Sequence, residues 1–157
     1  HYAPYIFRSL RHLGVAEADV EDVCQEVFIT VHRKLLEFEG RSAIKTWIYG
    51  ICLRTASDYR RRAHVRRELP VGEATAIEAA VLDASSSPVE SRQLIFSLLD
   101  QLDEEKRQVF VLYESEGFTM REVAEIVGCP LQTAYSRLYA ARDQLRALLE
   151  PGPSEGS

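Results

Sequence analysis

The polar side chains best spaced for chemistry lie together near the C-terminal end of this 157-residue chain. They flank Ala134, Leu138 and Ala141, small or aliphatic residues that recur at the period of an amphipathic helix. Such a helix would turn its amides, hydroxyls and guanidinium toward a partner, where they can hydrogen-bond with base edges or phosphates. The presented residues are Gln132, Thr133, Tyr135, Ser136, Arg137 and Tyr139. Their chemistry is recognition, not the making or breaking of bonds.

The residues before this helix predict how it is held in place. Thr119 followed by Glu122 is a capping box, which favours a helix start. Gly128 can adopt the left-handed conformation that ends this helix, and Pro130 suits the first turn of the next one. With the small Ala124 at the crossing, the pattern predicts a helix-turn-helix. An ordinary pair of packed antiparallel helices is the alternative.

No pattern for a catalytic or metal centre accompanies this motif. The chain has no nucleophile elbow, phosphate-binding glycine loop, zinc-protease motif or dinucleotide-binding glycine pattern. Cys24, Cys52 and Cys129 are far apart, which favours reduced thiols in a cytoplasmic protein. No apolar run approaches the roughly 18 residues of a membrane helix. The sequence therefore predicts no enzymatic activity, no metal, no cofactor and no membrane insertion.

The net charge of −5 argues against a simple nucleic-acid binder, so the distribution of charge matters. Residues 1–70 carry 12 Lys and Arg against 9 Asp and Glu, whereas residues 93–150 carry 6 against 10. The basic excess is thus local. Most of it comes from the cluster Arg60, Arg61, Arg62, Arg66 and Arg67.

The periodicity predicts an all-α fold with two small helical domains. The first, residues 1–68, should contain three helices, with Asp19 and Ser42 as caps of the second and third. The apolar stripe of the second helix is Val20, Val23, Cys24, Val27, Phe28, Val31 and Leu35. On the third helix, Trp47 and Tyr59 fall on the apolar side, which favours a core role, and Tyr49 falls on the polar side.

The remaining chain divides into a linker, a second domain and a tail. Residues 69–87 are acidic, rich in Ala and Ser, and predicted to be a flexible linker. Ser87 and Glu90 form another capping box, with Pro88 at the first helical position. Residues 88–150 should hold four helices that end in the helix-turn-helix, and residues 151–157 a disordered tail.

Two blocks of sequence resemble the extracytoplasmic-function group of the sigma-70 family of RNA polymerase sigma factors. The segment from Asp19 to Phe28, DVEDVCQEVF, resembles the group's DAEDVVQEVF signature, and FEGRSAIKTW from Phe38 to Trp47 is similar to the loop that follows it. Ile51 to Arg62 continues the match, and the C-terminal motif is similar to the family's fourth region. The resemblance covers Tyr2 to Leu149. It implies sigma region 2, a linker and sigma region 4.

The resemblance implies a factor that binds core RNA polymerase and promoter DNA. Asp22, Gln25 and Glu26, which share one helix face, would dock on the clamp helices of the largest polymerase subunit. The fourth region would meet the flap region of the polymerase. An inhibitory anti-sigma protein is a further partner common in the family.

The resemblance also assigns two DNA-binding surfaces. The minus-ten element would be melted and held by Arg41, Ser42, Lys45, Tyr49, Arg54, Arg60, Arg61 and Arg62. The helix from Leu131 would read the minus-thirty-five element in the major groove. Two usual basic positions of that helix are Tyr135 and Ala140 here, and Arg54 replaces a frequent asparagine. We therefore expect a non-standard promoter sequence, and weak DNA binding by the isolated C-terminal domain.

A different class of protein is the alternative interpretation. A helix-turn-helix repressor or activator would bind operators as a dimer and would not dock on polymerase. No leucine-rich dimer seam or ligand-binding domain is recognisable in the sequence. Specific binding to duplex DNA without polymerase would distinguish this regulator from a sigma factor.

Overall fold

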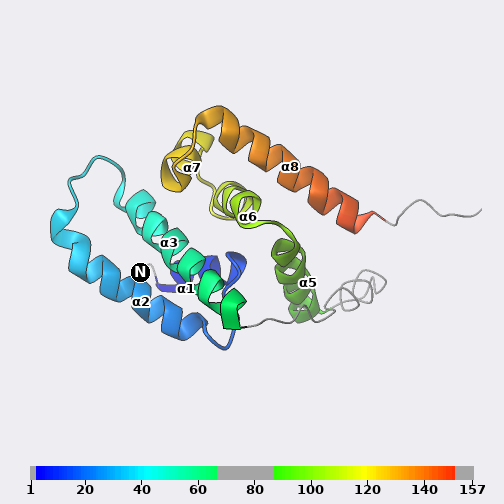
Figure 1. The fold of residues 1–157 in the computed structure, drawn as a ribbon, viewed down its shortest axis with the longest axis horizontal. Helices are drawn as coiled ribbons and strands as arrows, with labels where there is room; N and C mark the ends of the chain where they lie inside the picture. Colours follow the sequence, from blue (N-terminus) through cyan, green and yellow to red (C-terminus); the bar gives the residue numbers. More distant parts are fainter. Residues whose placement is uncertain (1–2, 67–86, 151–157) are drawn as a thin grey trace, which may run out of the picture.

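The computed structural model describes residues 3–66 and 87–150, and every regular element within them is helical (Figure 1). The expected linker, apart from Ser87, and the expected tail lie outside the described residues. The prediction of an all-α fold is confirmed. Among the described helices, none is both long and apolar enough to cross a lipid bilayer. The helices of the N-terminal half are α1 (Ala3–His12), α2 (Val20–Lys34) and α3 (Ile44–Arg66), and a 3-10 turn, Leu35–Glu37, follows α2.

Helix α2 packs against both α1 and α3 through one side. Val20, Val23 and Val27 are buried on that side, as the apolar stripe predicts. Cys24 and Val31 of the stripe are partly buried and pack against the core. The expected burial of Phe28 and Leu35 was wrong, because their side chains are 41% and 46% exposed.

The starts of two helices differ from the expected caps. Asp19 stands at the N-cap of α2, but its side chain makes no capping hydrogen bond. Its carboxylate instead accepts from the Tyr59 hydroxyl on α3. Helix α3 begins at Ile44, and the first backbone bond runs from the Trp47 amide to the Ala43 carbonyl, so Ser42 is not its cap. Trp47 and Tyr59 pack against the core as predicted.

The C-terminal half begins with the expected capping box. The Ser87 hydroxyl accepts from the Glu90 amide, and the Glu90 carboxylate accepts from the Ser87 amide. Helix α5 (Pro88–Gln101) then meets α6 (Glu104–Phe110) at a corner stabilised by Arg107. This buried guanidinium donates to the backbone carbonyls of Leu99 and Leu102. Burial lowers the pKa of Arg107 to about 10, so the side chain remains charged at neutral pH.

The helix-turn-helix has the predicted construction. A π turn, Val111–Ser115, continues α6 and leads to α7 (Met120–Val127), which begins at the Thr119–Glu122 capping box. Gly128 ends α7 with a φ of 76°, and α8 (Leu131–Leu149) follows after Pro130. Ala124 is buried on α7, which packs on α8.

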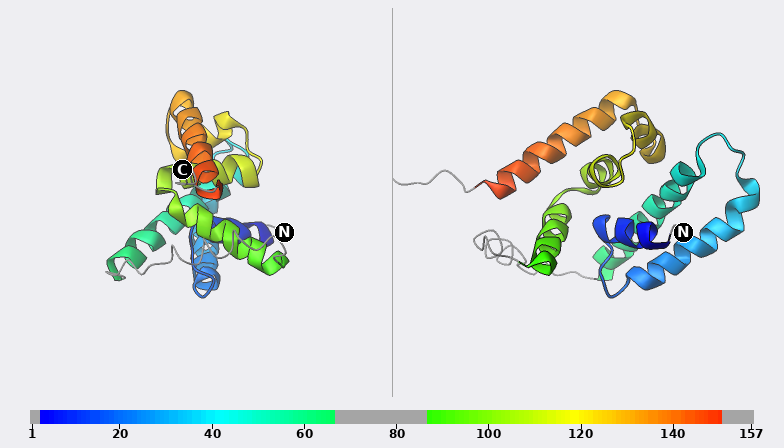
Figure 2. Two further views of the ribbon diagram at one scale, coloured as in Figure 1. Left: turned by 90° about the vertical axis from the view of Figure 1, so that its right-hand side faces the viewer. Right: turned by 180° about the vertical axis from the view of Figure 1, so that it is seen from behind.

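The two halves of the chain pack directly against each other. Helix α3 contacts α7, and α1 contacts α5 (Figures 1 and 2). Buried residues from both halves consequently form a single hydrophobic cluster. The sequence predicts two separate cores and leaves their relative placement open. The structure shows the two halves in contact, and we call this the closed arrangement.

The capping box of α7 gives a test of the fold. Thr119→Ala removes the oxygen that accepts from the Glu122 amide, and should lower the free energy of unfolding by about 1 kcal/mol. The midpoint of thermal unfolding should fall by roughly 2–4 °C. Thr119→Ser keeps the hydroxyl and should melt near the wild-type temperature. Equal midpoints for the alanine variant and the wild type would show that this cap contributes no stability.

Candidate nucleic-acid interface

Helix α8 presents a polar and aromatic face opposite the residues that it buries. Ala134, Leu138 and Ala141 pack inward. Of the six residues predicted to face a partner, four are exposed and two, Thr133 and Arg137, are half-buried. The exposed residues are Gln132, Tyr135, Ser136 and Tyr139. The rings of the two tyrosines stack with centroids 6.2 Å apart, so they form one continuous aromatic surface on this face.

Acidic residues of the same half pair with the arginines of α8. Arg137 lies 3.5 Å from the Glu105 carboxylate, and its side chain is only 24% exposed. Arg142 donates through both Nε and Nη2 to Glu114. The exposed face of α8 between residues 131 and 139 is therefore uncharged. It can contact base edges through hydroxyl, amide and ring, but it brings little positive charge to phosphates.

An arginine outside α8 was missed by the sequence analysis. Arg121 on α7 is exposed and has no ion pair within the described parts of the chain. The first helix of a helix-turn-helix crosses the DNA backbone, which makes Arg121 a candidate phosphate contact. Its position two residues after the cap could have indicated this role.

The residues predicted to bind the minus-ten element divide between two sides of α3. Arg54, Arg61 and Arg62 are exposed on one side. Lys45, Tyr49 and Arg60 lie on the other, where their partners belong to the C-terminal half. Before this helix, Arg41 is highly exposed and pairs with Glu39 at 2.8 Å, and Ser42 is half-buried. The structure thus does not bring the set together on one surface.

Tyr49 is the largest departure from the expected positions. It was placed on the polar side of the helix, yet it is 1% exposed because α7 and the residues before it cover it. Its hydroxyl donates to Glu116 at 2.7 Å. Burial, followed by this hydrogen bond, raises the pKa of the Tyr49 hydroxyl, so the group stays protonated and acts as a donor.

Arg60 also has an interior role. Its Nη1 donates to the Gly14 carbonyl at 3.2 Å and lies 3.4 Å from the Asp100 carboxylate on α5. Gly14 has a φ of +99°, and a Cβ atom there would collide with the guanidinium. Arg60 therefore joins the α1–α2 turn to the C-terminal half.

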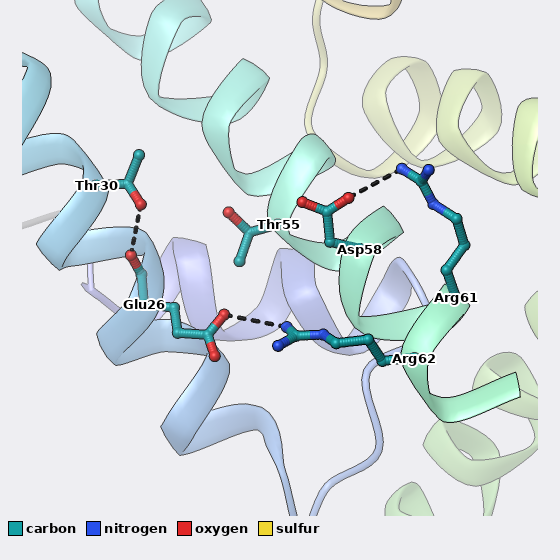
Figure 3. Close-up of a pocket in the computed structure, with 6 residues that line it drawn as sticks. All are labelled: Glu26, Thr30, Thr55, Asp58, Arg61 and Arg62. Carbon is teal, nitrogen blue, oxygen red and sulfur yellow. Dashed lines mark hydrogen bonds and ion pairs between the residues drawn. The ribbon is translucent and has the colours of Figure 1, made fainter. Parts of the chain in front are cut away.

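A polar groove of about 540 Å³ runs between α2 and α3. Figure 3 shows Glu26 of α2 and Arg62 of α3 pointing toward each other across it, with their charged groups 3.4 Å apart. Beside them Arg61 pairs with Asp58 at 2.9 Å. A residue predicted to dock on protein and a residue predicted to bind DNA are therefore partners in one ion pair.

The residues predicted to dock on polymerase form an open surface. Asp22, Gln25 and Glu26 are all exposed on one face of α2, as their spacing predicts. Ile29 follows one turn later on the same face and is 56% exposed. Ile29 was not among the predicted docking residues, although its spacing of three residues from Glu26 places it on this face. The face can offer both carboxylates and an apolar contact to a partner.

Comparison with known families matches both halves. Residues 1–66 match the model described as "Sigma-70 region 2", and residues 92–145 match "Sigma-70, region 4". The ECF RNA polymerase sigma-E factor of Escherichia coli K12 is 36% identical over 155 residues, which cover 91% of this chain and 80% of that protein. The factor of the same name from Haemophilus influenzae is 31% identical over 149 residues, covering 87% and 78%.

Two solved structures share the fold. CnrH, in complex with the cytosolic domain of CnrY, aligns with a TM-score of 0.69 and 26% identity, covering 94% of this chain and 82% of that one. The sigma factor RpoE from Bartonella quintana, in complex with the anti-sigma factor NepR, aligns with a TM-score of 0.72 over 96% and 93%. At 20% identity, this second likeness concerns the fold alone.

The ion pair of Arg137 generates a prediction about binding to duplex DNA. Glu105→Gln should release the guanidinium for a phosphate and steepen the dependence of log affinity on log salt by roughly one unit. Fluorescence anisotropy of a labelled duplex at several salt concentrations measures this slope. Glu17→Gln is the matched control, because it removes the same charge from an exposed residue outside the C-terminal half. Equal slopes for the two variants would contradict the prediction.

Proposed function

The chain belongs to the extracytoplasmic-function group of the sigma-70 family, and on that premise we propose how its two halves divide the work of a sigma factor. As a member, it is a transcription initiation factor that binds core RNA polymerase and directs it to specific promoters. The observation that carries this conclusion is the presence of regions 2 and 4 in their family order, with 36% identity to a sigma-E factor across 91% of the chain. Its contribution is binding, in the cytoplasm where the polymerase works, without a catalytic step of its own.

The N-terminal half docks on the polymerase through α2. The carboxylates of Asp22 and Glu26 accept hydrogen bonds from arginines of the largest subunit's clamp helices, and the Gln25 amide can exchange hydrogen bonds with polar groups there. Ile29 adds an apolar contact beside them. Because Glu26 pairs with Arg62 in the free chain, docking through Glu26 would release Arg62 toward DNA. Protein binding and DNA binding would thereby be coupled within one groove.

The minus-ten element meets α3 and the loop before it. Arg54, Arg61, Arg62 and Arg41 are exposed and can contact phosphates of the melted strand without rearrangement. Tyr49 and Arg60 can join them only after the C-terminal half has moved away, since it covers them here. Lys45 is exposed, but its ammonium lies over the Phe118 ring. Ser42, between Arg41 and Lys45 in the sequence, is half-buried.

The minus-thirty-five element meets the exposed face of α8 in the major groove. Gln132 is suited to adenine, and Ser136 and Thr133 to a phosphate or a base edge. Tyr135 and Tyr139 offer ring edges to thymine methyl groups, which is an apolar contact. This neutral face would give the isolated region weak affinity for DNA. We propose that specific binding therefore depends on the polymerase, whose flap region holds region 4 in place.

An inhibitor is part of the same proposal. CnrH and the Bartonella quintana sigma factor were each solved in complex with another protein, the latter with an anti-sigma factor. A comparable inhibitor of this chain would cover the α2 face or the exposed arginines of α3. An operator-binding regulator is not favoured, because the matches to regions 2 and 4 extend over both halves of the chain.

In vitro transcription tests the function directly. Purified core polymerase with a promoter library should produce new transcript start sites only when this protein is added. Aligned upstream sequences should reveal both promoter elements. A gel shift on the selected promoters should show little specific binding by the protein alone. Tight specific binding without polymerase would instead support the operator-binding regulator.

Charge reversal tests the docking face. Asp22→Lys with Glu26→Lys should weaken assembly with core polymerase at least about tenfold, because like charges would then oppose each other at the interface. The affinity can be measured by fluorescence with labelled protein. Glu17→Lys with Glu125→Lys makes the same change of net charge at exposed positions elsewhere and should assemble normally. Normal assembly of the first variant would show that the docking assignment is wrong.

A further inference from the structure

The carboxylate of Glu116 lies at the contact between the two halves and is held by groups from the other half. Its side chain is 1% exposed. Its Oε1 accepts from the Ser9 hydroxyl at 2.8 Å, and its Oε2 accepts from the Tyr49 hydroxyl at 2.7 Å. The Arg8 guanidinium lies 3.6 Å from the same carboxylate. Within the described residues, the hydrogen bonds and the ion pair of this buried carboxylate thus all come from α1 and α3.

An aromatic ring accompanies this anion. Phe118, two residues further along, packs edge-on against the Tyr49 ring with centroids 5.1 Å apart and an interplanar angle of 76°. The ammonium of Lys45 lies 5.2 Å from the centre of the same Phe118 ring. The N-terminal half therefore provides two adjacent positions, one for an anion and one for a flat ring beneath a cation.

An anion beside a flat ring is also the chemistry of one nucleotide in a single strand. Proteins bind such strands by combining cationic or hydroxyl contacts to the phosphate with rings on which bases stack. We propose that Arg8, Ser9, Lys45 and Tyr49 form a binding site for a nucleotide unit of the melted promoter strand, and that Glu116 and Phe118 occupy it in the free protein. This inference rests on the proposed function. It adds α1 to the DNA-binding surface and makes the closed arrangement autoinhibitory.

The geometry of a promoter requires the two halves to separate. Elements centred near minus ten and minus thirty-five are roughly 25 base pairs, or about 85 Å, apart at 3.4 Å per base pair. Here α3 and α7 are in direct contact, so the two surfaces cannot reach both elements at once. Separation uncovers the donors of Arg8, Ser9 and Tyr49 just when a single strand becomes available. The DNA strand then takes the place of the Glu116 carboxylate and the Phe118 ring, and so keeps the two halves apart.

The central experiment uses the full chain and the variant Glu116→Gln. The amide keeps the size of the side chain but removes the negative charge, so the closed form should be less populated. Small-angle scattering should show a larger radius of gyration. A fluorescein-labelled single strand of about 12 nucleotides should bind at least about threefold more tightly, because apparent affinity rises with the fraction of the open form. Glu125→Gln is the control for the loss of one charge and should change neither measurement comparably.

A second variant identifies the site itself. In the Glu116→Gln background, Arg8→Gln should abolish the gain in single-strand affinity while the chain stays open. Arg8 is half exposed, so its replacement should leave thermal unfolding nearly unchanged. Arg33→Gln, which removes the same charge from an exposed position of α2, should preserve most of the gain. If Arg8→Gln and Arg33→Gln reduced the gain in single-strand affinity equally, Arg8 would not be part of a specific site, and the inference would be wrong.

Two other outcomes would also overturn the inference. An open chain without tighter single-strand binding would mean that Glu116 covers no nucleotide site. A chain that stays closed and binds as before would mean that Glu116 does not hold the halves together. In either case, wild-type protein that still directs core polymerase to promoters would leave the proposed function standing. Failure of wild-type transcription would instead remove the proposed function.

Discussion

The two halves meet around one buried carboxylate, that of Glu116, and share a hydrophobic cluster. Removing an anion from water is unfavourable unless hydrogen bonds and an opposite charge compensate for the lost solvation. Among the described residues, Glu116 finds that compensation in the other half of the chain, from Ser9, Tyr49 and Arg8. The contact between α3 and α7, the ring of Phe118 and the buried Tyr49 lie at the same place.

Pairing of charge within the molecule extends beyond that contact. Arg60 joins Asp100, Arg62 joins Glu26, and Arg137 joins Glu105. In each pair an acidic residue holds an arginine that DNA would otherwise attract. Such an excess of acidic partners agrees with the net charge of −5. We therefore expect the free factor to bind promoters poorly by itself. Because these pairs are partly exposed, each contributes little stability and can exchange partners when polymerase and DNA arrive.

Local features of the fold could be predicted because neighbouring residues determine them. Both capping boxes and the left-handed Gly128 follow from short spacings, and all are confirmed. Predictions of which side of each helix is buried were less complete. Phe28 and Leu35 continue an apolar stripe that the neighbouring helices do not cover, and Asp19 accepts from Tyr59 instead of capping its helix. Each miss involves a partner that is distant in the sequence.

The sequence by itself determined the helices, their order, the helix-turn-helix and the exposed polar face of α2, since periodicity and capping act within a few residues. It also identified which residues of α8 are presented, apart from the half-buried Thr133 and Arg137. Only the tertiary structure decided that Tyr49 is buried, that Arg60 turns inward and that Arg137 is paired. These facts depend on residues 40 to 70 positions apart in the first two cases, and on the packing of α6 against α8 in the third. No local pattern encodes such contacts, because a side chain's environment depends on which helices lie next to it after folding.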